Sequence, residues 1–389
     1  MKHLIGILCV MLFTLESSCT KSVCAQELNL DAAKVQFEIE IPSFKDSAEI
    51  RYSDIFSNVR YVELEAKCND AYISFITHME ITNDNDIIVL DFNNKKVLRF
   101  DSNGHFLNLI GEAGHGHNEY LYPRSIAYDK YENQILVWDV FAQKILYYNL
   151  DGAIKKSIKL GMDCSEIKVI DKNHLILFLN YNDNTGFNYL VIDKEGKECF
   201  KFEKIPHPEV LKSKPTTTYA LNNSDNGGIL CRAPYSSTMY RVDGQGAIPF
   251  LRFVPKEKNW LLGKPEDISK LITLKKPSCI NASIIVKGKL FLTGYIPTQK
   301  STYVLCHDLQ KKTTRCGKNF VNDMNGFLKH RLYKQHKGGD IYFLIYPDDF
   351  RNLLDSWKDR TDIPQKDREF VTKMANSTNP IIQICTVKD

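Results

Sequence analysis

The chain lacks long hydrophobic runs and any excess of one charge. Its apolar stretch from Leu4 to Leu15 is too short for a membrane helix, which needs about 20 residues. Its 51 Lys and Arg residues are balanced by 47 Asp and Glu residues, spread along the whole length. We therefore expect no nucleic-acid partner, and no membrane contact other than a lipid anchor at the N-terminus.

Several catalytic motifs are also missing. The sequence has no GxSxG nucleophile elbow, no GxxxxGK(S/T) phosphate loop and no dinucleotide fingerprint. Of its 11 cysteines, three lie in the first 24 residues and the others form no CxxC pair, which argues against a zinc ribbon or a thioredoxin-like site. We expect no nucleotide cofactor. Enzymatic activity stays open, and a non-enzymatic role is favoured.

The N-terminal residues indicate export. Residues 1–18 have the short apolar core of a signal peptide. The residues that end at Cys19 resemble a bacterial lipobox, with Glu16 as a departure, so Cys19 would be lipidated and become the mature N-terminus. The alternative is ordinary cleavage after Ala25. Residues 19–50 then form a tether, and the protein is expected in the periplasm or at the outer membrane.

A unit of roughly 45 residues recurs along the chain, which is the length of one propeller blade. Its clearest copies are IIVLDFNNKKVLRFDSNGHFLNLIG, ending at Gly111, and QILVWDVFAQKILYYNLDGAIKKSIKL, ending at Leu160. Each copy alternates strands with short turns, and no copy could bury its apolar faces without a neighbour on either side. The repeat therefore predicts sheets that are arranged radially.

Five complete units can be placed, and a sixth is shared between the two ends of the chain. The complete units span residues 75–111, 125–160, 166–205, 219–254 and 280–320. The sixth begins at Phe327, and a C-terminal strand at 380–387 and an N-terminal strand around Val59 complete it. Such sharing removes the exposed sheet edges of an open ring. We predict an all-β, six-bladed β-propeller over residues 51–389, as one domain and a monomer.

Propeller geometry assigns the connections to two faces. Turns between first and second strands, and between third and fourth strands, share one face and are all short. The other face receives the long connections, at residues 111–123, 206–218, 255–277 and 347–379. Two helices are expected on this face, at 260–274 and 348–360. Because insertions gather on it, we predict that this is the binding face.

Asp91 and Asp139 end the second strands of the first two units, and so point toward the axis on the predicted binding face. A ring of such carboxylates could bind calcium, as in lactonase-like propellers. The matching places in later units hold Asn180, Arg232, Gly294 and Tyr346. This mixture suits a polar organic ligand better than an ion. The alternative is that each Asp caps its own following loop.

Aromatic residues are expected on the same face. They are Phe92, Phe141, Tyr181, Tyr235, Tyr295 and Tyr346. Exposed rings could stack on sugars, because they offer an apolar surface beside polar neighbours. The alternative is that the rings wedge between blades. The provisional ligand-binding residues are Asp91, Arg124, Asp139, Tyr181, Arg232 and Tyr346.

His115, His117 and Glu119 form the only compact cluster of metal-binding or acid–base residue types, within a glycine loop. An HxH pair could bind zinc if another blade supplied a third ligand, but the sequence identifies none. The alternative is that Glu119 accepts backbone N–H groups and holds the loop shut, with Tyr120 packed beneath.

Cys306 and Cys316 flank the turn HDLQKKTT at nearly equal distances. They could therefore face each other across a hairpin and form a disulfide in an oxidising periplasm. The alternative is that both are small apolar strand residues.

The phrase GEAGHGHNEYLYP resembles the GxxGxGxxEY segment of a six-bladed propeller family from Bacteroidota that is related to NHL-repeat propellers. The segments SDIFSNVRYVELE, VLDFNNKKVLRFDSNG and NPIIQICTV are similar to the same family. The chain departs from it at HGHNEY, where members often have GPGEY. This resemblance implies a six-bladed fold and a place in the cell envelope, often as a lipoprotein.

Three functions remain in view. The favoured one is a non-enzymatic envelope protein that binds a protein partner or a glycan on its loop-bearing face, with no cofactor. The first alternative is a lyase or lactonase-like enzyme that depends on calcium or zinc at a central site. The second alternative is a structural module of the envelope.

Overall fold

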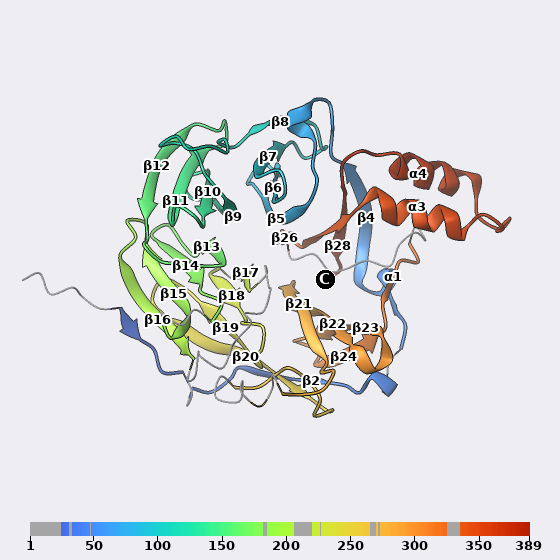
Figure 1. Ribbon diagram of the computed structural model, residues 1–389. Coiled ribbons are helices and arrows are strands. Elements are labelled where there is room, and N and C mark those ends of the chain that lie inside the picture. The colour runs from blue at the N-terminus through green and yellow to red at the C-terminus, as the bar shows by residue number, and fades with distance from the viewer. Residues whose placement is uncertain are drawn as a thin grey trace, which may run out of the picture.

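The repeat folds as four-stranded antiparallel sheets that fan around one axis (Figure 1). The structure, a computed structural model, describes residues 25–30, 33–46, 48–181, 185–205, 220–225, 227–264, 270, 273–324 and 335–389. Each blade runs outward from an inner strand at the hub, and the inner strands of blades 1, 2, 3, 4 and 6 contact one another around the axis. The six-bladed β-propeller is thus confirmed.

Blades 1 to 3 follow the chain in order. Blade 1 contains β5 (Ile76–Ile81), β6 (Ile87–Asp91), β7 (Lys96–Phe100) and β8 (Phe106–Leu109). Blade 2 contains β9 (Pro123–Asp129), β10 (Gln134–Asp139), β11 (Lys144–Asn149) and β12 (Ile154–Lys159). Blade 3 contains β13 (Glu166–Val169), β14 (His174–Phe178), β15 (Phe187–Asp193) and β16 (Glu198–Lys204).

Blades 4 and 5 continue the series, and blade 6 joins the two ends. Blade 4 contains β17 (Leu221–Asn223), β18 (Ile229–Cys231), β19 (Thr238–Val242) and β20 (Ala247–Pro255). Blade 5 contains β21 (Cys279–Val286), β22 (Lys289–Ile296), β23 (Ser301–Asp308) and β24 (Thr313–Gly317). Blade 6 contains β26 (Gln335–Lys337), β27 (Asp340–Ile345), β28 (Ile381–Val387) and, outermost, β4 (Phe56–Glu63).

Closure of the ring follows the prediction. Ile382 of β28 pairs with Val62 of β4, and Cys385 pairs with Val59, in antiparallel register. The predicted start of the sixth unit at Phe327 lies outside the described residues.

The core lies between blades rather than within one. Ile87 and Val89 of β6 pack toward blade 6, whereas Ile88 and Leu90 pack toward blade 2. Successive residues of a strand point to opposite faces, so a strand buried on both sides reads as a continuous apolar run. Among the described residues, each pair of adjacent blades encloses one apolar cluster of this kind.

The segment predicted as a tether runs along the rim instead. β1 (Gln26–Glu27), β2 (Phe37–Ile41) and β3 (Ile50–Arg51) pair in parallel with β16, β20 and β25 (Phe320–Val321), respectively. The reason is the alternation of FEIEI, which buries Ile39 and Ile41 against blades 4 and 5 and leaves Glu38 and Glu40 exposed. A short helix, α1 (Tyr52–Ile55), leads from β3 into β4.

We call the face that carries connections between second and third strands, and between blades, the loop face. The opposite face, with the short turns, is the turn face. Helices α3 (Pro347–Ser356) and α4 (Gln365–Ala375) are inserted between β27 and β28, on the loop face as predicted, beside blade 6 (Figure 1). Phe350 and Val371 bury their side chains in the cluster beneath these helices. Short 3-10 turns lie at Phe44–Asp46, Asn69–Ala71 and Pro297–Gln299.

The helix predicted at 260–274 lies partly outside the described residues. Its predicted start is wrong, because Trp260 and Gly263 form isolated β-bridges with Ser278 and Ser236. Within the described part of the chain, no helix has the length and apolar character needed to cross a bilayer.

The disulfide that the sequence left as one alternative for Cys306 and Cys316 does not form, and both are buried strand residues, as the other alternative stated. In the hairpin of β23 and β24, Cys306 lies opposite Arg315, and Cys316 lies opposite Leu305. A register offset by one residue sends the two side chains to opposite faces of the sheet. Cys306 packs toward blade 6 and Cys316 toward blade 4, so no disulfide joins them.

Candidate functional site

Asp91 and Asp139 end the second strands of blades 1 and 2 and hold the loops around them. The Asp91 carboxylate accepts the N–H groups of Ser74 at 2.8 Å and Phe75 at 3.0 Å. The Asp139 carboxylate accepts the N–H groups of Leu121, Tyr122, Phe141 and Ala142. Both carboxylates are fully buried. They therefore cap loops, which was the alternative reading of the sequence, and they position the aromatic residues beside them.

Those aromatic residues form a continuous patch across blades 6, 1 and 2 on the loop face. We define the aromatic surface as Tyr346, Phe75, Phe92, Tyr122 and Phe141. The rings of Phe75 and Tyr346 stack with centroids 6.4 Å apart, and those of Tyr122 and Phe141 stack at 5.0 Å. Phe92 packs edge-on against Tyr122 at 5.3 Å, and its N–H donates to the Phe75 carbonyl. Five aromatic residues from three blades thus form one stacked pair and one group of three contacting rings, which the backbone hydrogen bond between Phe92 and Phe75 links.

The aromatic surface is open to solvent and flanked by cations. Phe141 is 71% exposed and Phe75 is 47% exposed. The Arg124 guanidinium lies 5.9 Å from the centre of the Phe92 ring, and the Lys95 ammonium lies 5.2 Å from that of Tyr122. Cation–π contacts of this kind hold a polar group beside each ring. The surface therefore offers apolar faces and hydrogen-bond donors side by side.

Tyr346 anchors the blade 6 end of the surface. Its hydroxyl accepts the N–H of Ile76 at 3.2 Å, and its backbone N–H donates to Asp349 in the first turn of α3. The structure thus brings four of the six predicted ligand-binding residues to this region, namely Asp91, Arg124, Asp139 and Tyr346.

Tyr181 and Arg232 lie apart from the aromatic surface, buried between blades 3 and 4. Tyr181 accepts the N–H of Tyr235 at 3.3 Å, and burial raises the pKa of its hydroxyl far above the usual value. The Arg232 guanidinium donates to the carbonyls of Ala233, Pro234, Ser236 and Ile280. Both side chains are committed to the fold in this structure.

Glu203 completes this buried group. Its carboxylate accepts from the Asn188 side chain at 3.1 Å, and burial raises the pKa of Glu203 to about 7. Hydrogen bonds from Ser236 and Asn188 and the charge of Arg232 oppose that rise.

The glycine loop adopts the closed form that the sequence left as an alternative. The Glu119 carboxylate accepts the N–H of Gly116 at 2.8 Å, and a side chain at Gly114 would overlap this carboxylate. Tyr120 is buried beneath the loop, whereas His115 and His117 are exposed. Across the ranges that the structure describes, no three His, Cys, Asp or Glu side chains come together as a metal site.

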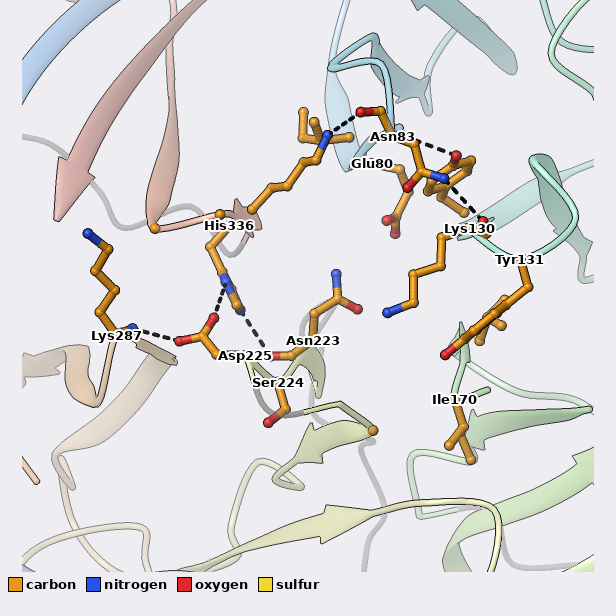
Figure 2. Close-up of a pocket in the computed structure, with 17 residues that line it drawn as sticks. Glu80, Asn83, Lys130, Tyr131, Ile170, Asn223, Ser224, Asp225, Lys287 and His336 are labelled. Atoms are coloured by element: carbon orange, nitrogen blue, oxygen red, sulfur yellow. Dashed lines mark hydrogen bonds and ion pairs between the residues drawn. The ribbon is translucent and has the colours of Figure 1, made fainter. Parts of the chain in front are cut away.

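A cavity of about 540 Å³ opens at the axis on the turn face (Figure 2). We call it the axial pocket. Every blade contributes to it through the turn between its first and second strands, with residues that include Asn83, Lys130, Ile170, Asp225, Lys287 and Gly338. None of the six predicted ligand-binding residues lines it.

The wall of the axial pocket holds a buried ion pair between Glu80 of β5 and Lys168 of β13. His78 lies on β5, two residues before Glu80. Burial and the nearby charges of Lys168 and Arg124 lower the pKa of His78 to about 3, so its imidazole is neutral at physiological pH. The hub therefore contains charged groups beside apolar residues such as Ile81 and Val169.

Sequence reasoning missed the axial pocket because it ranked faces by loop length. The signal that could have found it is the polar start of the turns after the inner strands, at Asn83, Lys130, Ser224 and Lys287. Short turns leave the mouth of a hub uncovered, and polar residues at that mouth face one another.

Solved structures similar to this chain show the fold. One similar structure is that of a predicted exported protein from Bacteroides fragilis. It matches with a TM-score of 0.66 and 16% identity, over 91% of this chain and 99% of that chain. A member of the DUF4221 family from Bacteroides vulgatus matches with a TM-score of 0.47 and 12% identity, over 86% and 97%. Virginiamycin B lyase from Staphylococcus aureus matches with a TM-score of 0.43 and 11% identity, over 85% and 99%. The last two are too distant to support an argument about function.

No curated protein matches the chain. The family described as "Domain of unknown function (DUF4934)" matches residues 35–386, which include the second rim strand and all six blades. The resemblance to Bacteroidota propellers that the sequence motifs indicated is thereby confirmed. The chain therefore belongs to the DUF4934 family.

Proposed function

We propose that this protein is a non-enzymatic, exported propeller of the cell envelope that binds a saccharide chain on its aromatic surface. The single observation that carries the proposal is the set of neighbouring rings from Tyr346 to Phe141 on the loop face, of which Phe75 and Phe141 are exposed to solvent and the other three are half-buried. An exposed apolar patch of this kind is costly in water and marks an interaction site.

The chemistry of the aromatic surface favours a saccharide over an apolar protein helix. A sugar ring presents C–H groups on its faces and hydroxyl groups at its edge, so it needs flat apolar surfaces beside hydrogen-bonding groups. Phe75 and Phe141 supply the flat surfaces, and Arg124 and Lys95 supply the adjacent donors. The rings come from three neighbouring blades, which suits an extended chain of several sugar units.

The aromatic surface is also rigid. Asp91 fixes the backbone of Phe75, and Asp139 fixes that of Tyr122 and Phe141, through buried carboxylates. A preorganised surface loses less conformational entropy on binding, so modest contacts can give measurable affinity. Asp91 and Asp139 thus act as positioning residues.

Localisation remains part of the proposal. The signal peptide and the lipidation of Cys19 fall within residues 1–24, outside the described residues. An envelope location is supported by the Bacteroides fragilis neighbour, which is described as a predicted exported protein. A saccharide-binding protein at the periplasm or outer membrane would meet polysaccharides there. Mass spectrometry of the mature N-terminus distinguishes lipidation at Cys19 from cleavage after Ala25.

A glycan array tests the proposal directly. We expect the wild-type protein to bind at least one class of polysaccharide, and Phe141→Ala to weaken that binding at least about tenfold, which corresponds to about 1.4 kcal/mol. Leu107→Ala is the matched control, because Leu107 is 45% exposed on the outer strand β8, away from the rings. Absence of binding to every glycan, together with capture of one specific envelope protein by the same surface, would replace the saccharide with a protein partner.

A further inference from the structure

We propose that the axial pocket is a second, separate binding site for a small hydroxylated carboxylate, such as a sugar acid. The site lies on the turn face, opposite the aromatic surface, and does not depend on the proposed function. Its volume of about 540 Å³ is within the range of small-molecule sites, about 300–1,000 Å³.

The charge of the axial pocket favours an anion. The carboxylate of Glu80 is paired with Lys168. The Asp225 carboxylate accepts the backbone N–H of Lys287 at 2.6 Å and lies 3.6 Å from His336, but burial lowers the pKa of His336, so its ring does not supply a positive charge there. Lys337 donates only to neutral oxygens, those of Thr82, Asn83 and the Asn85 side chain. Among the described charged groups that line the pocket, two ammonium groups, those of Lys130 and Lys337, therefore contact no carboxylate, whereas one carboxylate, that of Asp225, contacts no cation.

Lys130 is the cation that points into the cavity (Figure 2). Its ammonium lies 5.2 Å from the centre of the Tyr131 ring, and within the described ranges it has no hydrogen-bond acceptor. An ammonium in a concave site is an effective partner for a carboxylate, because the surrounding protein screens the charge less than open water does.

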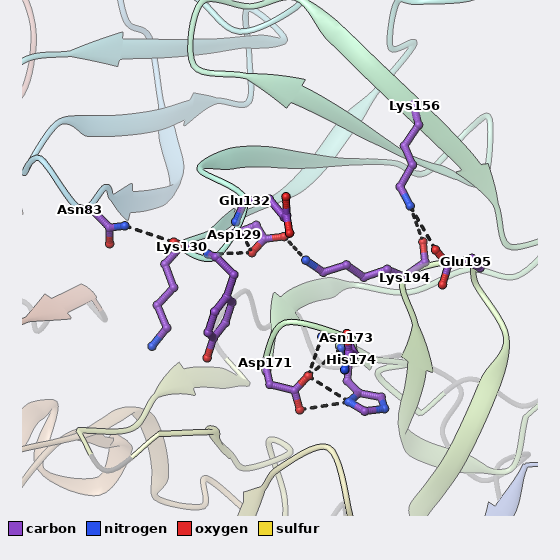
Figure 3. Close-up of polar contacts among 11 residues, drawn as sticks. Asn83, Asp129, Lys130, Glu132, Lys156, Asp171, Asn173, His174, Lys194 and Glu195 are labelled. Atoms are coloured by element: carbon purple, nitrogen blue, oxygen red, sulfur yellow. Dashed lines mark hydrogen bonds and ion pairs between the residues drawn. The ribbon is translucent and has the colours of Figure 1, made fainter.

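The turn that presents Lys130 is fixed from both sides (Figure 3). The Asn83 side chain of blade 1 donates to the Lys130 carbonyl at 3.1 Å. The adjacent Asp129 carboxylate accepts the N–H of Tyr131 at 3.1 Å and forms an ion pair with Lys194 of blade 3. The direction of the Lys130 stem is therefore set before a ligand arrives, which lowers the entropy lost on binding.

Polar groups around Lys130 could form hydrogen bonds with the hydroxyl groups of such a ligand. In the part of the chain that the structure describes, the Asn223 amide and the hydroxyls of Ser224 and Tyr131 have no protein hydrogen-bond partner. The Asn223 amide points into the cavity in Figure 2. These groups can donate to and accept from hydroxyls of a ligand whose carboxylate pairs with Lys130. An inorganic anion would leave them unused.

Isothermal titration calorimetry with galacturonate, glucuronate and gluconate tests the inference, with galactose and inorganic phosphate as comparisons. We expect saturable binding of at least one of the three acids. Galactose, which lacks the carboxylate, and phosphate, which lacks the polyhydroxyl body, should bind at least about tenfold more weakly. Binding should also weaken as salt is added, because the charge of Lys130 contributes to it.

Variants assign any binding to the axial pocket. Lys130→Met should weaken binding of the acid at least about tenfold, and Asn223→Ala should weaken it to a smaller extent. Lys155→Met is the matched control, since Lys155 is an exposed lysine on the outer strand β12. Phe141→Ala should leave binding of the acid unchanged, which separates this site from the aromatic surface. The inference is overturned if none of the acids binds, if phosphate or galactose binds as well as they do, or if binding is insensitive to Lys130→Met while the variant unfolds like the wild type.

Discussion

Glu203 shows how burial between two blades changes the chemistry of one side chain. Its pKa rises from the usual 4.5 to about 7 because the carboxyl group is removed from water. The folded protein therefore holds this proton more tightly than the unfolded chain does. The stability that the neutral form provides is fully present below about pH 4.5 and is lost as the pH rises through about 7.

Replacement of Glu203 by Gln should therefore stabilise the protein at high pH. Relative to the wild type, Glu203→Gln should gain up to roughly 3 kcal/mol above pH 8 and almost nothing at pH 4.5, as measured by denaturant unfolding across this range. Glu198→Gln, a change on the same strand β16, is the control and should show no such pH-dependent gain. A constant difference between wild type and Glu203→Gln at all pH values would contradict the assignment.

Individual site residues could be predicted in position but not in role. The sequence places Asp91 and Asp139 correctly at the ends of second strands, because the repeat sets the register. It raises capping of the following loop only as an alternative. It does not reveal the additional N–H donors that come from the connection before the inner strand of the same blade, such as Ser74 for Asp91 and Leu121 for Asp139. Tyr181 and Arg232 occupy comparable depths in the repeat, but both are buried. Tyr181 packs in the cluster between blades 3 and 4, and Arg232 donates to carbonyls of its own loop and to that of Ile280 in blade 5.

The rim strand β2 is the element whose contribution is easiest to isolate. Ile41 is fully buried against blades 4 and 5, although it belongs to a segment predicted as a tether. Ile41→Ala should lower the free energy of unfolding by about 2–4 kcal/mol, because it removes a buried side chain and leaves a cavity. Chemical denaturation measures this loss.

Glu40→Ala provides the control on the same strand. Glu40 is exposed and its ion pair with Lys256, at 3.2 Å, lies at the surface, so its loss should change stability by no more than about 0.5 kcal/mol. Equal effects of Ile41→Ala and Glu40→Ala would show that β2 is not packed on the blades.

The strands that belong to the repeated blades could be predicted from the sequence, whereas the position of the rim strand β2, which belongs to no repeat, could not. The blades have neighbours of the same pattern, so the predicted spans of blades 1 to 5 agree with the structure to within a few residues. The pattern FEIEI signals a strand, but a lone strand has no repeat to indicate which blade it joins. For Cys306 and Cys316, the sequence indicates the hairpin but not its exact register. A shift of one residue in the pairing sends a side chain to the opposite face of the sheet, so the sequence could not decide whether the two cysteines meet.

The whole molecule depends on the sheet that both ends of the chain share. Blade 6 takes β4 from the N-terminal part and β26, β27 and β28 from the C-terminal part. Without this sheet, blades 1 and 5 would each expose an apolar face. Closure thus makes the unfolding of six blades a single cooperative event.

Ile382→Asp tests this closure. Ile382 is fully buried in β28, so a carboxylate there should abolish cooperative unfolding or give insoluble protein, as followed by calorimetry and gel filtration. Ile248→Asp on the outer strand β20 is the control, because Ile248 is 45% exposed and should tolerate the change. A soluble Ile382→Asp variant with a wild-type transition would argue against closure by the two ends.

At this scale the sequence predicts the ring and its two faces, but not the size of the opening at the hub. The width of the axial pocket depends on how six inner strands pack around the axis, which no single blade encodes. Of the aromatic surface, the sequence predicts Phe92, Phe141 and Tyr346 from their places in the repeat. It misses Phe75 and Tyr122, which lie in the connections before the inner strands of blades 1 and 2.

Hydroxyl-radical footprinting of the protein with a bound saccharide tests the central claim most directly. If a saccharide chain lies on the aromatic surface, oxidation of Phe75 and Phe141 should fall on binding, while oxidation of Tyr131 on the turn face should not change. Unchanged oxidation of Phe75 and Phe141 while the saccharide is bound would contradict the account.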